Sequence, residues 1–163
     1  MEHETRHQTY LALLESSLIK KCELITNLME LTKEQEALFV KDRVDEERFN
    51  RIIEDKDGQI QLLIKLDEGF EQIYQHVKDE LSLHSGRYQI EISRLKSLIT
   101  KATDDSVQLQ VMEKRNSLKI EGFFRTKRRE IKNLKQSNQL VSSYYKNSTD
   151  HSMQQSYFLD QKK

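Results

Sequence analysis

The chain has 163 residues, of which 36% are hydrophobic and 33% are charged, and its 27 basic and 27 acidic side chains balance to zero net charge. The apolar fraction is low for a compact globular core, and the neutral charge argues against a nucleic-acid binder. The chain contains no proline, where average usage would give about eight at this length. Because proline breaks helix interiors, the composition indicates long, uninterrupted helices.

A first helix is predicted over about residues 5–41. Its apolar side chains recur at steps of mostly three, four or seven residues, as an apolar stripe on a helix requires. Cys22 lies beside the stripe, and we interpret it as a buried thiol rather than a reactive one. The stripe consists of Leu11, Leu14, Leu18, Ile25, Leu28 and Phe39, with Leu38 also beside it.

A second helix is predicted over about residues 46–84. Asp45 can cap its start, because its carboxylate accepts backbone N–H groups of the first turn. Gly58 and Gly69 each cost roughly 1 kcal/mol relative to alanine, but packing should carry the helix through both. The apolar stripe of this helix consists of Phe49, Ile52, Ile53, Ile60, Leu63, Leu66, Phe70, Ile73, Tyr74, Val77 and Leu81.

A third helix is predicted over about residues 87–145. Gly86 precedes it and could end the second helix in the left-handed conformation. Residues 103–106 are four poor helix formers, which we interpret as a solvated turn of a continuous helix rather than a kink. The stripe consists of Tyr88, Ile92, Leu95, Ile99, Ala102, Leu109, Met112, Ile120, Phe124, Ile131, Leu134, Val141 and Tyr145.

These patterns predict an all-α protein, an elongated antiparallel bundle of three long helices with coiled-coil-like packing, the third being the longest. A single helical domain would cover residues 1–146. Residues 147–163, rich in Ser, Gln, Asn and Thr, would form a flexible, disordered tail. That tail ends in an apolar cluster of Tyr157, Phe158 and Leu159.

The third helix would exceed the second by roughly 19 residues, or about 28 Å, and this excess still carries apolar side chains. Such an exposed stripe usually marks an interaction surface. Residues 113–135 carry a net charge of +6 and residues 45–80 one of −6, which would either offset each other or steer an acidic partner. The predicted surface consists of Phe123, Phe124, Ile131, Leu134, Val141, Tyr144 and Tyr145, flanked by Arg125, Lys127, Arg128, Arg129, Lys132 and Lys135. Alternatively, the two phenylalanines help to close the bundle core.

No pattern of catalytic, cofactor-binding or metal-binding residues stands out. His3 and His7 have the spacing of two metal ligands on one helix face, but they lie at the chain terminus. The three consecutive bases at 127–129 are too few to indicate nucleic-acid binding. No stretch approaches the ~20 apolar residues of a membrane span, and residues 1–8 lack a signal-peptide pattern. We therefore expect a cytoplasmic, non-enzymatic protein without cofactor or metal.

Several helical strings, in order and spacing along most of the chain, are similar to those of one protein family. They are YLALLESSL at 10–18, LTKEQE at 31–36, EDKD at 54–57, LDEGF at 66–70, EKRN at 113–116, KRREIK at 127–132, YYKN at 144–147 and YFLDQKK at 157–163. In these strings the chain resembles the FlgN family of flagellar export chaperones, in its clostridial-type form.

The resemblance implies a cytosolic chaperone of the flagellar type III export system. Such proteins bind the C-terminal helical segments of hook–filament junction (hook-associated) proteins, keep them unassembled and deliver them to the export gate. The family's binding role maps to the C-terminal helix, here residues 123–145, and the cluster at 157–159 would be a further contact. A FliT-like chaperone of the filament cap stays open as an alternative, as does a structural or adaptor coiled coil, including a homodimer, without a client.

Overall fold

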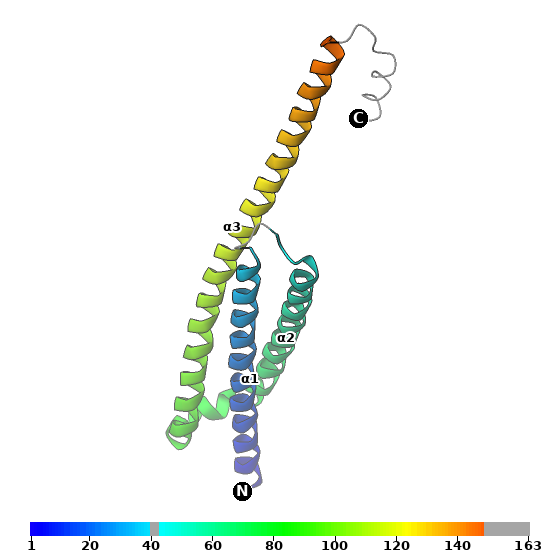
Figure 1. Cartoon of the computed structure of the whole chain (residues 1–163). Coiled ribbons are helices and arrows are strands. Elements are labelled where there is room, and N and C mark those ends of the chain that lie inside the picture. Colours follow the sequence, from blue (N-terminus) through cyan, green and yellow to red (C-terminus); the bar gives the residue numbers. More distant parts are fainter. Residues whose placement is uncertain (40–42, 149–163) are drawn as a thin grey trace. The chain divides into compact units, whose positions relative to one another are not determined.

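The computed structural model describes residues 1–39 and 43–148, which form three long helices and one short 3₁₀ turn (Figure 1). The elements are α1 (Glu2–Leu38), α2 (Glu46–Leu83), η1 (Ser85–Tyr88) and α3 (Gln89–Ser148). The part of the chain that the structure describes contains no strand. The predicted all-α class, with three long helices of which the third is the longest, is confirmed.

The helix ends differ from prediction by a few residues. α1 begins and ends about three residues earlier than expected. α3 begins at Gln89, because the preceding residues form the 3₁₀ turn η1, and it continues to Ser148. Gly86 lies inside η1 and does not take the expected left-handed conformation. Residues 149–163, most of the predicted tail, lie outside the described residues, and the expected extent of one domain over 1–146 stays a prediction.

Local sequence features explain how α2 begins and why the helices continue. The Asp45 carboxylate accepts a hydrogen bond from the backbone N–H of Arg48 at 3.0 Å, which confirms the predicted N-cap. Gly58 and Gly69 lie within α2, and residues 103–106 lie within α3 without interruption. Both continuity expectations are therefore confirmed.

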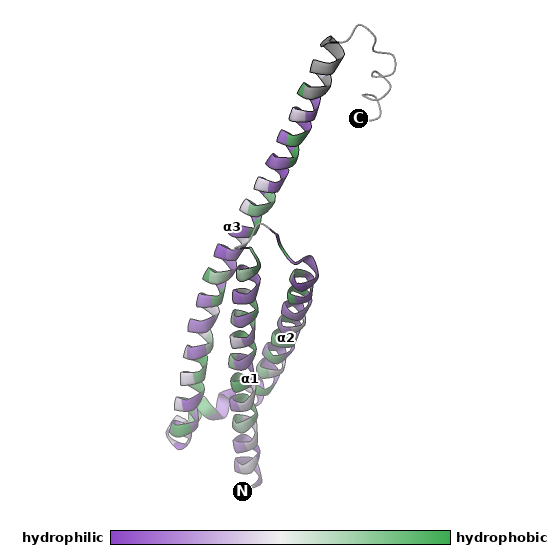
Figure 2. Ribbon diagram, in the orientation of Figure 1, coloured by the Kyte–Doolittle hydropathy of each residue, from purple (hydrophilic) through white to green (hydrophobic). Residues whose placement is uncertain are grey.

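The chain groups into two compact units, residues 1–119 and residues 120–163. In the first unit, α1, α2 and the first half of α3 lie side by side, and α2 runs antiparallel to the other two (Figure 1). Green and purple bands alternate along each of these helices, as expected for amphipathic helices that bury one face (Figure 2).

Two apolar clusters hold the first unit together. One consists of Leu11, Leu14, Leu18, Val77, Tyr88 and Leu95, and the other of Cys22, Ile25 and Ala102. Cys22 is 7% exposed, so its predicted burial is confirmed. The short turn η1 brings Tyr88 into the first cluster, where the side chain is 2% exposed and its hydroxyl donates to Glu80 Oε1 at 3.3 Å. Burial raises the pKa of the Tyr88 phenol.

Candidate functional site

The residues predicted to form a binding surface lie in the second unit, where residues 120–148 are helical. Phe124, Ile131 and Leu134 are 48%, 57% and 66% exposed. At 3.6 residues per turn these three positions fall within an arc of about 80°. We call the face that they form the apolar face of residues 120–148. Leu140 is 72% exposed but falls on the opposite side of the helix, and it was not among the predicted residues.

The two adjacent phenylalanines contact each other edge-on, with ring centroids 5.6 Å apart. Phe123 is partly buried, and Lys127 Nζ lies 5.6 Å from its ring centroid, at the distance of a cation–π contact. Lys127 also pairs with Glu130 at 3.3 Å. Neither phenylalanine belongs to the two core clusters.

The helical segment 120–148 carries seven basic and two acidic residues, a net charge of +5. Five of the six predicted flanking bases are exposed, namely Arg125, Arg128, Arg129, Lys132 and Lys135, and Lys127 is partly buried. The side chains of Val141, Tyr144 and Tyr145, and the cluster Tyr157, Phe158 and Leu159, lie outside the described part of the structure. The apolar face thus lies among positive charges.

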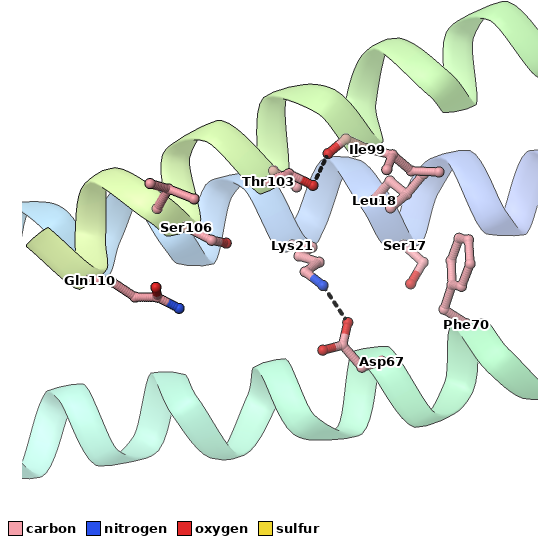
Figure 3. Close-up of a pocket in the computed structure, with 11 residues that line it drawn as sticks. Ser17, Leu18, Lys21, Asp67, Phe70, Ile99, Thr103, Ser106 and Gln110 are labelled. Atoms are coloured by element: carbon pink, nitrogen blue, oxygen red, sulfur yellow. Dashed lines mark hydrogen bonds and ion pairs between the residues drawn. The ribbon is translucent and has the colours of Figure 1, made fainter.

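A second candidate surface is a groove of about 440 Å³ in the first unit, between α2 and α3, with α1 as its floor (Figure 3). The Lys21 side chain extends from α1, and its ammonium pairs with Asp67 Oδ1 of α2 at 2.7 Å (Figure 3). The Thr103 hydroxyl donates to the backbone carbonyl of Ile99 at 2.8 Å within its own helix. The lining residues are Ser17, Leu18, Lys21, Asp67, Phe70, Ile99, Ala102, Thr103, Ser106, Val107 and Gln110.

A buried polar network, which was not predicted from the sequence, joins the three helices of the first unit. Gln35 Oε1 accepts hydrogen bonds from Lys56 Nζ and from Asn116 Nδ2, both at 3.0 Å. Lys56 also pairs with Glu113. The Thr32 hydroxyl lies 2.7 Å from the carbonyl of Leu28 and 2.8 Å from Glu113 Oε1, and its single proton serves one of them at a time. Four of these side chains, those of Thr32, Gln35, Lys56 and Asn116, are buried.

The sequence did contain a signal for this network. Thr32, Gln35 and Asn116 occupy positions at which the apolar stripes of α1 and α3 continue, and Lys56 falls between Ile52 and Ile60 on α2. Polar residues at core positions of a helix bundle often fix which helices pair and in which register. This arrangement therefore indicates a structural role.

Beside this network, Glu36 accepts from Lys119 and lies 3.4 Å from an Arg115 guanidinium nitrogen. The hydrogen bond from Lys119, together with the two positive charges, holds the pKa of the Glu36 carboxyl below its ordinary value. Across the described residues, no cluster of three or more His, Cys, Asp or Glu side chains is placed to bind a metal ion. Over residues 1–39 and 43–148, no helix has the length and apolar character that a membrane crossing needs.

Comparisons of the chain with protein-family models, with curated proteins and with solved structures find no match. A functional assignment therefore depends on the chain's own residues and on the geometry described above.

Proposed function

We infer that this chain is a binding protein of the flagellar export chaperone type, similar to FlgN, which takes up C-terminal helical segments of hook–filament junction proteins. The observation that carries this proposal is the apolar face of residues 120–148, where Phe124, Ile131 and Leu134 are about half to two-thirds exposed. The sequence resemblance to the FlgN family supports the same region.

Burial of apolar surface supplies the affinity. An amphipathic client helix that covers this face removes apolar area from water at about 25 cal/mol per Å². Part of this gain is offset by the entropy lost when a disordered client segment becomes ordered. We therefore expect moderate affinity, which suits a chaperone that must release its client for export.

The basic residues around the face supply orientation. Net charge of +5 over residues 120–148 attracts a client segment that carries acidic residues beside its apolar stripe. Because these bases are mostly exposed, their effect should weaken as salt increases. The client's apolar contacts should persist at high salt.

The decisive experiment is a fluorescence titration of the full chain against C-terminal segments of both junction proteins, with a filament-cap segment as control. Leu134→Ala should weaken binding to the junction segments by about fivefold or more, since a buried leucine contributes 1 kcal/mol or more. Leu140→Ala is the matched control, because it makes the same substitution on the opposite face of the same helix. Circular dichroism should show equal helicity in both variants.

Each alternative predicts a different result. Binding to the filament-cap segment alone would replace the assignment with a FliT-like chaperone. Saturable binding to no segment would overturn the chaperone assignment in favour of a structural coiled coil. Equal loss of affinity in the Leu134→Ala and Leu140→Ala variants would show that the client does not use the apolar face.

A further inference from the structure

One face of α2 beside the groove carries apolar residues that are only partly covered. Ile60, Ile64 and Tyr74 are 43%, 46% and 39% exposed. Asp67 of α2 lines the groove. Ile60 and Ile64 precede Asp67 by seven and three residues, and Tyr74 follows it by seven. At these spacings a helix places all three on the same face as Asp67. Ile60 and Tyr74 were predicted to belong to the apolar stripe of α2. The structure exposes both because the stripe is wider than the surface that α1 covers.

The opposite wall of the groove shows the same feature. Ile99 and Val107 of α3 line the groove and are 45% and 55% exposed. Between them the wall carries the uncharged polar side chains of Thr103 and Ser106. An open channel between two amphipathic helices, with a third as floor, is the place that a fourth helix occupies in a four-helix bundle.

Charge identifies the kind of helix that fits. α2 carries ten acidic and five basic residues, a net charge of −5. The acids Glu68 and Glu71 are exposed on this helix near the groove-lining Asp67. An amphipathic helix with a basic surface would therefore pair favourably with this wall.

The chain itself contains such a helix, namely residues 120–148, with its apolar face and its net charge of +5. The 29 residues of this helix measure about 43 Å. The helix is therefore long enough to cover the partly exposed stretch of α2 from Ile60 to Tyr74, which measures roughly 21 Å. α3, from Gln89 to Ser148, contributes both this segment and one wall of the groove. The charge and apolar face of this segment therefore make the same segment of a second copy the occupant that fits the groove.

We propose that this protein forms a homodimer in which residues 120–148 of each copy dock into the groove between α2 and α3 of the other. The contact is reciprocal, so each copy supplies one groove and one helix, as a two-fold dimer requires. Two such contacts are formed at once, so the dimer buries twice the area of a single helix-in-groove contact. The proposal does not rest on the chaperone assignment. Because a client and a second copy would use the same apolar face of residues 120–148, they would compete for it.

The test is sedimentation equilibrium of the full chain between about 1 and 100 µM, where a dimer of moderate affinity changes population. Val107→Asp places a charge in the groove, and Leu134→Asp places one on the docking helix. Each should weaken dimerisation by at least about tenfold. Ile90→Asp and Leu140→Asp are matched controls. Both residues are exposed, Ile90 opposite the groove-lining face of α3 and Leu140 opposite the apolar face of residues 120–148. Both substitutions should leave dimerisation unchanged.

A mixture of the Val107→Asp and Leu134→Asp proteins distinguishes this geometry from other dimers. In the mixed dimer, the intact helix of one chain meets the intact groove of the other, so one of the two contacts is restored. If each substitution abolishes the contact that it alters, both homodimers lose both contacts whereas the mixed dimer keeps one, so the mixture should associate more tightly than either variant alone. A chain that stays monomeric at all concentrations, or a dimer insensitive to Val107→Asp, would overturn the proposal. So would a mixture no tighter than its components when each variant alone has lost both contacts.

Discussion

Lys56 of α2 donates to the Gln35 amide oxygen of α1 over 3.0 Å, and both side chains are buried. The same oxygen accepts from Asn116 of α3, also at 3.0 Å, so three helices meet at one acceptor. Buried polar groups are costly when unpaired. The network therefore favours the one register in which all three partners coincide, and it disfavours sliding of otherwise similar apolar stripes.

Replacing Lys56 by methionine should lower the free energy of unfolding by about 1–3 kcal/mol, because the Gln35 oxygen loses a charged donor and Glu113 loses its ion-pair partner. Glu113 is 43% exposed and can be hydrated, which keeps the loss below that of a fully buried pair. Urea denaturation measures the effect. Lys65→Met, at an exposed position of the same helix, is the control and should change stability little. Equal stability of the two variants would mean that the network contributes specificity without net stability.

The ring of Tyr88, rather than its hydroxyl, should account for most of its contribution to stability. Tyr88→Ala empties a core position at 2% exposure and should cost about 3–5 kcal/mol. Tyr88→Phe removes only the 3.3 Å hydrogen bond to Glu80 and should cost about 0.5–1.5 kcal/mol. Thermal or urea unfolding of the two variants side by side tests this. A phenylalanine variant as unstable as the alanine variant would assign the main role to the hydrogen bond.

Glu36 should make stability depend on pH in the acidic range. Its pKa in the folded state is lowered below the ordinary 4.5, chiefly by the hydrogen bond from Lys119. A carboxyl with a lowered folded-state pKa contributes stability that is present above pH 4.5 and is lost as pH falls through the lowered value. Because the carboxylate is near the surface, we expect its ionised form to contribute about 0.5 kcal/mol to the free energy of unfolding. At pH 6 the free energy of unfolding of the wild-type protein should exceed that of the Glu36→Gln variant by this amount. The difference between the two proteins should vanish at the lowest pH at which the fold persists. A difference that does not change with pH would contradict this assignment.

Alanine at two helical glycines should stabilise the protein. Gly58 and Gly69 lie inside α2 without positive φ, and a Cβ added at either meets no atom within 4 Å. Each substitution should add about 0.5–1 kcal/mol to the free energy of unfolding, because glycine loses more backbone entropy in a helix. Gly86→Ala is the comparison outside the α-helices and should gain less. A destabilising result at Gly58 or Gly69 would contradict this prediction.

Apolar periodicity predicted much of the core correctly, because burial in a helix bundle follows local spacing. Leu14, Ile25 and Val77 were placed on the apolar stripes, and each is at most 1% exposed. Ile53, Ile60 and Ile99 were also predicted to lie on those stripes, but these side chains are 43–45% exposed. Spacing identifies an apolar face without showing how much of it a neighbouring helix covers.

Part of the candidate sites could be predicted from the sequence, and part could not. The exposed positions of Phe124, Ile131 and Leu134 followed from the expected excess length of the third helix, and their role in client binding stays a prediction. The groove was not foreseen, because its lining comes from three helices whose separation depends on side-chain packing. The buried network was missed because Lys56 and Asn116 look like surface residues until their partners on other helices are known.

The sequence by itself determined that this protein is three long amphipathic helices, since proline content, caps and apolar spacing act within a few residues of the chain. Tertiary structure alone decided which polar residues are buried and which apolar residues line an open groove. The physical reason is the separation along the chain between the residues that interact. Helix formation is governed by neighbours three or four positions apart, whereas burial depends on contacts such as those between Gln35 and Asn116, 81 positions apart.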